Sequence, residues 1–425
     1  MSDAMAPEEL ARLDAAHVLH PHATVGHPAR PLVIARGRGA RVWDAEGKEY
    51  IDGTGGLWLN AVGHGREELA RAAAEQMRQL EYYSSFGDLA NEPSIRLAAR
   101  LAQLAPAHMN TVYFTNGGSE GNETAIKLVR LAQHHAGKPE RTTILSRRDA
   151  YHGSSGTSMA ASGLDRLKQG FGPAAPGFIH LSAPRARTRS ETDALVEEVE
   201  RIIEETGAEH IAAFIGEPVQ GVGGVVTPPE GYWEGVQAVL RRHGVLFIVD
   251  EVITAYGRTG YWFASQRYGL DADVIVTAKA LTSGYVPMGA VLISDRLRHM
   301  LDGAEFRHGF TFNGHPVGAA VALENLRIME QEHLVQRAEE MGAWLLAELR
   351  QLEAAGHVVE VRGVGMMLAI ELSCDPTPAV QAAREAGVLV RGYPPCIIIC
   401  PPLVLEQAQA ERLVQVLREQ LLALR

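Results

Sequence analysis

The sequence predicts an α/β protein whose large domain contains a mostly parallel central sheet. Two observations lead to this fold class. Short apolar runs recur between about residues 110 and 293, and amphipathic helical stretches separate several of them. Runs that are apolar throughout are typical of strands buried on both faces, as in a parallel sheet covered by helices. An antiparallel sandwich fits poorly, because the segments between the runs are too long and too helical.

Each predicted strand of the central sheet corresponds to one apolar run of the sequence. The predicted strands are residues 112–115, 143–146, 178–181, 211–215, 245–249, 274–276 and 290–293. The predicted helices between them are residues 123–134, 194–205 and 232–242.

The two ends of the chain predict smaller structures. Near the N-terminus, residues 31–52 alternate apolar runs with Gly-rich breaks, which favours a small antiparallel element with a hairpin turn at residues 44–48. After His315 a helical region covers residues 325–352. The elements expected beyond it are strands at residues 358–361, 366–371 and 396–400, and a closing helix at residues 406–424.

Composition and charge exclude some classes of partner. The 425 residues carry a net charge of -11, which argues against nucleic acid and against an anionic membrane surface. No stretch approaches the roughly 20 apolar residues of a membrane span. The opening residues, MSDAMAPEEL, are polar and acidic and do not resemble a signal peptide. We therefore predict a cytoplasmic protein.

The three cysteines are few and lie late in the chain, which points to a reducing compartment. Cys396 and Cys400 have a spacing that a metal site could use. They lie in an apolar run without a second Cys or His pair nearby, so we expect buried, inert thiols and no metal site.

An acid and an amine each follow an apolar strand. Asp250 comes directly after the run at residues 245–249, and Lys279 follows the run at residues 274–276. Ligands of parallel sheets bind outside the carboxyl ends of the strands, so these two side chains can face the same crevice. A structural ion pair is the alternative interpretation.

Two further strand ends add candidates. Gly117, Gly118 and Ser119 lie between a strand and a helix, a pattern that favours binding of one phosphate group through backbone N–H groups. Neither a P-loop nor a G-x-G-x-x-G pattern is present. Tyr151 and His152 follow another strand and could present a flat surface to a ring. Alone, the glycines could simply begin a helix and the aromatic could belong to the core.

Together these parts describe a cofactor with one phosphate, a ring, a ring atom that needs a carboxylate and a carbonyl that needs an amine. Pyridoxal 5′-phosphate (PLP) fits every part, since its aldehyde condenses with a lysine and its pyridine nitrogen pairs with an acid. NAD would need two phosphates and a differently spaced ribose acid.

The motifs resemble those of a known family. The stretches GLWLNAVGHG, FTNGGSEGNE, AYHG, GEPVQGVGG, IVDEVITAYGRTG, TAKALTSGYVPMGA and HGFTFNGHPVG occur in that order. From Gly37 to Leu403 the chain resembles the class III, or ω-, aminotransferases of PLP fold type I. This resemblance implies a large PLP-binding domain at residues 61–325 and a small α/β domain made from residues 1–60 and 326–425. It also implies a homodimer with shared active sites; a tetramer stays open.

The resemblance implies roles for individual residues around the cofactor. Lys279 is expected to form the Schiff base and Asp250 to pair with the pyridine nitrogen. Val252 and Tyr151 are expected on opposite faces of the ring, with His152 beside Tyr151. The further residues that it assigns are Gly117, Gly118 and Ser119 at the phosphate, Glu217 near Asp250 and the phenolic edge of the cofactor, Thr311 reaching the phosphate of the other subunit, and Trp58 in the substrate pocket.

The substrate prediction also rests on the resemblance. Arg391 matches an arginine that binds the substrate carboxylate in relatives of the ω-amino acid:pyruvate type, and a guanidinium suits a carboxylate. Ornithine-type relatives carry an arginine where this chain has Ile398. We therefore expect transfer from an amine or ω-amino acid donor, of the β-alanine, taurine or simple-amine type, to an oxo acid, with pyruvate favoured. The alternatives are a PLP-dependent decarboxylase or aminomutase, an α-ketoglutarate-dependent aminotransferase, and a PLP-binding protein without turnover.

Overall fold

The structure is a computed structural model that describes residues 5–25, 31–354 and 356–424. Its central sheet has seven strands in the order β4-β10-β9-β8-β7-β5-β6. In chain order the strands are β4 (Thr111–Thr115), β5 (Thr143–Arg147), β6 (Phe178–Leu181), β7 (Ile211–Gly216), β8 (Leu246–Asp250), β9 (Val274–Thr277) and β10 (Gly289–Ile293). Only β10 runs antiparallel to its neighbours in this sheet, so the predicted mostly parallel α/β fold is confirmed.

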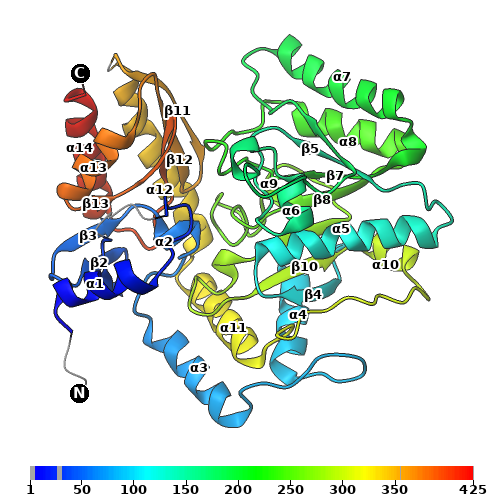
Figure 1. Ribbon diagram of the computed structural model, residues 1–425, viewed down its shortest axis with the longest axis horizontal. Helices are drawn as coiled ribbons and strands as arrows, with labels where there is room; N and C mark the ends of the chain where they lie inside the picture. Colours follow the sequence, from blue (N-terminus) through cyan, green and yellow to red (C-terminus); the bar gives the residue numbers. More distant parts are fainter. Residues whose placement is uncertain (1–4, 26–30, 355, 425) are drawn as a thin grey trace.

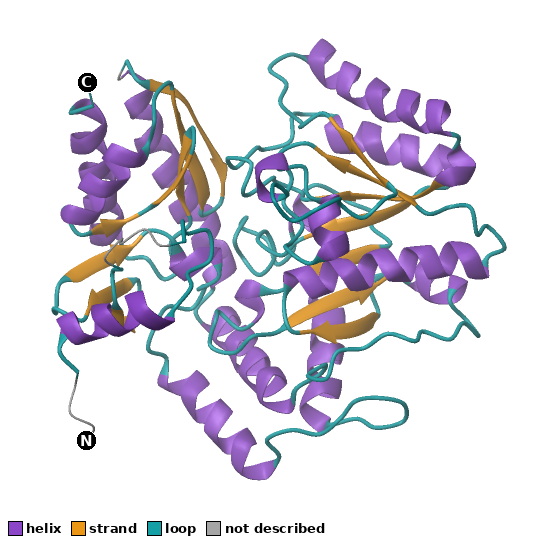
Figure 2. Ribbon diagram, viewed as in Figure 1, coloured by secondary structure: helices purple, strands orange, loops and turns teal. Residues whose placement is uncertain are grey.

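Helices cover both faces of the central sheet (Figure 2). Ile248 of β8 packs in one apolar cluster with residues of α5 (Gly118–His135). Its neighbour Val249 packs in another cluster with residues of α7 (Arg189–Thr206) and α8 (Tyr232–His243). Successive strand residues point to opposite faces, which explains why β8 has no polar residue before Asp250.

Two expectations about helices need correction. The helices α5 and α7 begin at Gly118 and Arg189, earlier than the predicted residues 123 and 194. The helical region predicted at residues 325–352 is divided into α11 (Pro316–Gln331) and α12 (Leu334–Arg350), because His333 adopts a left-handed backbone with φ of 51°. Helices that the sequence analysis did not predict are α1 (Pro7–His17), α2 (Gly55–Trp58), α3 (Glu67–Gln79), α4 (Glu92–Leu104), α6 (Gly156–Ala161), α9 (Ala264–Arg267), α10 (Asp295–Met300) and α13 (Thr377–Glu385).

The two ends of the chain lie side by side in Figure 1, where they are blue and orange to red. Here β1 (Ile34–Arg38), β2 (Arg41–Asp44) and β3 (Glu49–Asp52) form the predicted antiparallel element, and β13 (Val388–Leu389) pairs in parallel with β3. A second small sheet contains β11 (Val358–Val364), β12 (Met367–Leu372), β15 (Cys396–Ile399) and β14 (Arg391–Tyr393), and α14 (Gln407–Leu422) closes the chain.

Some expectations about the chain ends are not tested here. Residues 1–4 and 26–30 of the expected N-terminal segment lie outside the described residues. The domain boundaries near residues 60 and 325 stay predictions. Across the described ranges, no helix combines the length and the apolar character needed to cross a bilayer.

Candidate active site

Six strands of the central sheet end at one edge, and five of these ends lead to the candidate site. The strands β5, β7, β8 and β9 are parallel, and β4 has the same direction because the antiparallel β10 lies between β4 and β9. The residues just beyond these ends line one cavity of about 380 Å³. The predicted residues among its walls are Gly117, Gly118, Ser119, Tyr151, His152, Glu217, Asp250, Val252 and Lys279.

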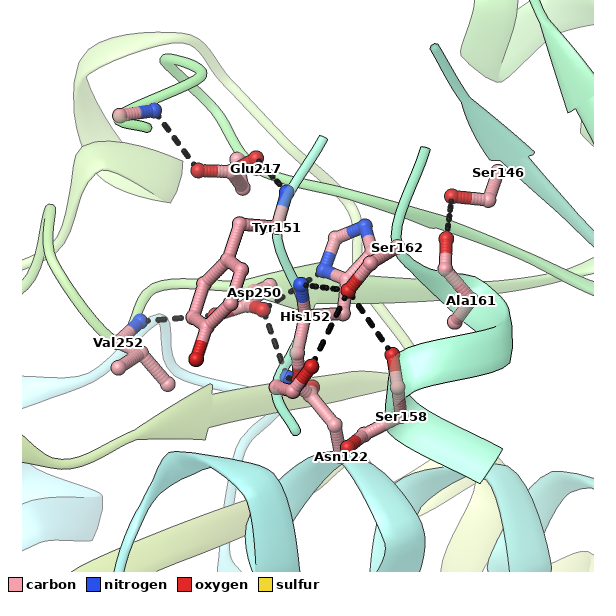
Figure 3. A network of polar contacts seen from close by, with 12 residues as sticks. Asn122, Ser146, Tyr151, His152, Ser158, Ala161, Ser162, Glu217, Asp250 and Val252 are labelled. Carbon is pink, nitrogen blue, oxygen red and sulfur yellow. Dashed lines mark hydrogen bonds and ion pairs between the residues drawn. The ribbon is translucent and has the colours of Figure 1, made fainter. Parts of the chain in front are cut away.

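The carboxylate of Asp250 is buried and accepts hydrogen bonds at both oxygens (Figure 3). The backbone N–H of Val252 donates to Oδ1 at 3.0 Å. At Oδ2, Nδ1 of His152 lies 2.8 Å away and Nδ2 of Asn122 donates at 2.7 Å. These donors compensate the carboxylate for the loss of water and fix its orientation at the cavity wall.

Lys279 begins a short 3₁₀ turn after β9 and adopts a left-handed backbone with φ of 45°. A lysine in this region is strained, and such strain is found at functional sites. Burial lowers the pKa of the Lys279 amine, and the negative charges of Asp250 and Glu217 offset only part of that effect. The amine therefore loses its proton more readily than a solvated lysine, as a nucleophile or base requires.

Glu217 follows β7 and fixes the loop that carries Tyr151. Its Oε1 accepts from the backbone N–H of Tyr151 at 3.1 Å, and its Oε2 accepts from Gly221 at 2.8 Å. Burial raises the pKa of Glu217. The phenol oxygen of Tyr151 lies 3.0 Å from Oγ of Ser154.

Trp58 brings the N-terminal segment to this edge of the sheet. It is buried, and Nζ of Lys279 lies 5.9 Å from the centroid of its ring. The sequence analysis missed Asp52, which holds the turn before Trp58 by accepting from the N–H groups of Thr54 at 3.0 Å and Gly56 at 2.8 Å. Although burial opposes ionisation, hydrogen bonds from His64 and Thr54 keep the pKa of Asp52 below its usual value.

Three predicted site residues do not line the cavity of the single chain: Trp58, Arg391 and Thr311. Arg391 on β14 is exposed, and its guanidinium has no hydrogen bond or ion pair with the residues described. Tyr393, further along β14, packs against the same apolar cluster as Tyr151, so this strand runs close to the site. Thr311 is exposed, and its carbonyl accepts from the hydroxyl of Tyr82 at 2.5 Å.

The phosphate turn has room for a ligand. Gly117 has an extended backbone, and a Cβ added there would meet nothing within 4 Å. At Gly118 an added Cβ would lie 2.9 Å from Val252, so only glycine lets the turn approach that side chain. The N-terminus of α5 supplies unpaired N–H groups beside the hydroxyl of Ser119. The chain thus offers phosphate donors, an acid and an amine around one cavity, as PLP requires.

Other expectations concern residues outside the cofactor cradle. Cys396 and Cys400 are buried free thiols, as predicted. The sequence analysis missed Asn122, although its position one helical turn after Ser119 on the same face of α5 is a signal that could have identified it.

Comparison with known proteins identifies the family. A model described as aminotransferase class-III matches residues 23–421. The chain is 40% identical over 410 residues to a putrescine–pyruvate aminotransferase of Pseudomonas aeruginosa, which covers 91% of this chain and 90% of that protein. An (S)-enantioselective omega-transaminase from Thermomicrobium roseum matches with a TM-score of 0.96 and 46% identity over 99% of both chains. An omega transaminase from Pseudomonas jessenii in complex with PMP matches with a TM-score of 0.94 and 37% identity over 97% of both chains.

These matches extend over nearly the whole chain and agree with the fold and with the group that the cavity can hold. The chain therefore belongs to the class-III aminotransferases, enzymes of PLP fold type I, and catalyses ω-type transamination between an amine donor and a keto acid with PLP as its cofactor.

Proposed function

We propose that this enzyme transfers the amino group of an amine or ω-amino acid, of the β-alanine, taurine or simple-amine type, to pyruvate. The observation that carries the donor class is the charge of the cavity wall. Among the described residues that line it, Lys279 is the one lysine or arginine. A donor therefore needs no carboxylate beside its reacting carbon. The relative that is a putrescine–pyruvate aminotransferase supports both the amine donor and pyruvate.

In this proposal Lys279 and Asp250 carry the chemistry. PLP supplies an electron sink for the carbanion that forms when the donor loses its proton. Asp250 pairs with the ring nitrogen and keeps it protonated. Lys279 would hold the cofactor at its aldehyde carbon. When the donor is bound, the free amine of Lys279 would take the proton from the donor carbon and deliver it to the cofactor's C4′ carbon, so it would serve first as base and then as acid.

The other residues of the cavity hold the cofactor. We assign Tyr151, with His152 beside it, and Val252 to opposite faces of the ring. Glu217 lies near its phenolic edge. The phosphate is assigned to Gly117, Gly118 and Ser119, and Trp58 forms a wall of the substrate pocket.

Arg391 is proposed to bind the carboxylate of the oxo acid. Its guanidinium is exposed and unpaired among the described residues, so no existing ion pair has to break before a carboxylate binds. Ile398 is fully buried in an apolar cluster that includes Trp58, so no guanidinium from that position enters the site. This difference from the ornithine type disfavours α-ketoglutarate as the main acceptor.

We further propose that the active enzyme is a homodimer, or a tetramer built from such dimers, in which Thr311 reaches the phosphate of the other subunit. Near Thr311 in the chain, Phe312 is an exposed large apolar side chain. Tyr83, Phe86 and Leu89 follow Tyr82, the residue that bonds to Thr311, and are also exposed. Apolar side chains gathered in this way are typical of an interface between chains.

A donor panel tests the substrate class. Purified enzyme is given β-alanine, taurine, putrescine or a simple arylalkylamine, and either pyruvate or α-ketoglutarate, while the visible absorption band of the cofactor is followed. We expect bleaching by the donor and recovery of the band with pyruvate. Recovery with α-ketoglutarate alone would contradict the acceptor, and release of carbon dioxide from an amino acid donor would indicate a decarboxylase.

Borohydride reduction tests the lysine. Reduction of the loaded enzyme, followed by peptide mapping, should place the label on Lys279, and Lys279→Ala should lose both the label and turnover. A label on another peptide would refute this assignment.

A further inference from the structure

The first turns of α5 hold the loop that follows β5. Oγ of Ser119 accepts from the backbone N–H of Ser154 at 3.1 Å. One turn later, Oε1 of Glu123 accepts from the N–H groups of Thr157 at 2.7 Å and Ser158 at 3.0 Å. Burial disfavours a charge on Glu123, yet these hydrogen bonds keep its pKa below the usual value. One face of α5 thus fixes the loop that carries Tyr151.

Asn122 lies between these two contacts and also reaches Asp250. Its side chain is 1% exposed, and Nδ2 donates to the carbonyl of His152 and to Oδ2 of Asp250, both at 2.7 Å (Figure 3). An amide has two N–H groups, so both donors are used. The acceptors set the orientation of the amide, because exchanging its nitrogen and oxygen would crowd three acceptor oxygens together.

His152 completes a closed network of hydrogen bonds with Asn122 and Asp250. Its Nδ1 lies 2.8 Å from Oδ2 of Asp250, and its backbone N–H donates to Oγ of Ser162 at 2.8 Å. Asn122 connects the backbone carbonyl of His152 to the same carboxylate oxygen. The loop and the carboxylate therefore cannot move independently while Asn122 is in place.

We propose that Asn122 is a positioning residue that sets the Asp250 carboxylate and the Tyr151 loop at a fixed separation before PLP binds. This inference rests on the proposed roles of Asp250 at the ring nitrogen and Tyr151 on the ring face. Without Asn122, the carboxylate loses one of its charge-assisted donors, and the loop keeps only the link to the acid through the His152 ring. The cofactor then binds more weakly, and its ring nitrogen has a less well oriented anionic partner.

The test compares Asn122→Ala and Asn122→Asp with the wild-type enzyme. Asn122→Asp has almost the same shape but places an acceptor against two acceptors. We expect the PLP dissociation constant of each variant to rise on the order of 10-fold, as for loss of a hydrogen bond to a charged group. We also expect the visible absorption band of the loaded enzyme to titrate at higher pH. A ring with a weaker anionic partner carries less positive charge and so holds the proton of the chromophore more tightly.

Gln133→Leu is the matched control. Gln133 lies on the same helix, is 1% exposed, and donates from Nε2 to the carbonyl of Ala212 at 3.2 Å, outside the cavity wall. It should lose stability without a change in the PLP dissociation constant or in the pH of the band. If the Asn122 variants instead behave like Gln133→Leu, Asn122 is structural only and the proposal is overturned.

Two further results keep the proposal open to refutation. Asn122→Ser keeps a donor in a smaller side chain, so it should fold and bind PLP with an affinity between those of the wild type and Asn122→Ala. Wild-type affinity in Asn122→Ser and in any other folded Asn122 variant would overturn the inference. Failure of the proposed function is separate, since it would appear in the wild-type enzyme as borohydride labelling away from Lys279.

Discussion

Nζ of Lys279 lies 5.9 Å from the centroid of the Trp58 ring, although the two residues come from opposite parts of the fold. Lys279 follows β9 of the central sheet, and Trp58 follows β3 at the N-terminal end of the chain. The apolar cluster that contains Trp58 also includes Ile253 and Met367. The amine of Lys279 and the ring of Trp58 therefore depend on the packing of separate parts of the chain.

Trp58→Ala should widen the substrate pocket at a cost in stability. Trp58 is buried, and removing a large buried aromatic costs about 3–5 kcal/mol. The ratio of kcat/KM for a bulky arylalkylamine to that for β-alanine should rise. Trp43→Ala on β2 is the control, since the guanidinium carbon of Arg36 lies 4.0 Å from the centroid of the Trp43 ring. This variant should lower stability without changing the donor ratio. An unchanged donor ratio in Trp58→Ala would contradict its place in the pocket.

Lys279→Met should stabilise the cofactor-free chain at neutral pH. Because burial lowers the pKa of Lys279 in the folded state, the unfolded chain binds more protons between that pKa and about 10.4, the pKa of a solvated lysine. Wild-type stability therefore rises with pH through this window, and the advantage of methionine shrinks. Urea unfolding of both proteins at pH 7 and pH 9.5 measures the difference. If the stability advantage of Lys279→Met grows with pH, folding does not lower the pKa of Lys279.

Gly117→Ala should weaken PLP binding without harming the fold. A Cβ at this position meets no atom of the chain within 4 Å, so it would occupy space that we assign to the phosphate. We expect a rise of about 10-fold in the PLP dissociation constant, as for loss of about 1.4 kcal/mol, with thermal stability unchanged. Gly156→Ala is the control, because a Cβ there also meets nothing. Equal PLP affinity in the two variants would place the phosphate elsewhere.

Arg391→Ala should impair the half-reaction with pyruvate and leave the half-reaction with an amine donor almost unchanged. Loss of a charge-assisted, bidentate contact is worth roughly 1.5–3 kcal/mol, so KM for pyruvate should rise about 10- to 100-fold. Bleaching of the cofactor band by an amine without a carboxylate should change little. Arg412→Ala on α14 controls for loss of an exposed arginine. If both variants keep the wild-type KM for pyruvate, Arg391 does not bind the acceptor.

The strands of the central sheet could be predicted because both of their faces are buried. In β8, Ile248 and Val249 pack under different helix layers, so the run is apolar throughout and easily recognised. By contrast, α3 buries only Leu69 and Gln76, so its sequence has no series of large buried apolar residues to mark it. No glycine or proline lies beside His333 to predict the break between α11 and α12.

The start of α5 was placed too late for a functional reason. Its first residues are polar or small because they contact the loop after β5 and the proposed phosphate turn, and the apolar pattern begins only at Ala125 and Ile126. Asp250, Lys279 and Tyr151 could be picked out because strand ends are recognisable in the sequence, whereas Glu217 came only from the family resemblance; all four line the one cavity. Arg391 and Thr311 are exposed and lie outside the cavity wall, and neither is marked by a local sequence pattern.

The pairing of β3 with β13 has a consequence for the growing polypeptide. The strand that leads into Trp58 is synthesised early, but its parallel neighbour does not exist until residue 388 has left the ribosome. Every strand that carries the acid and the lysine is complete long before that moment. The strands that precede Asp250 and Lys279 should therefore be able to pair before β3 gains its parallel neighbour, so a chain that terminates before residue 388 leaves β3 as an open edge strand.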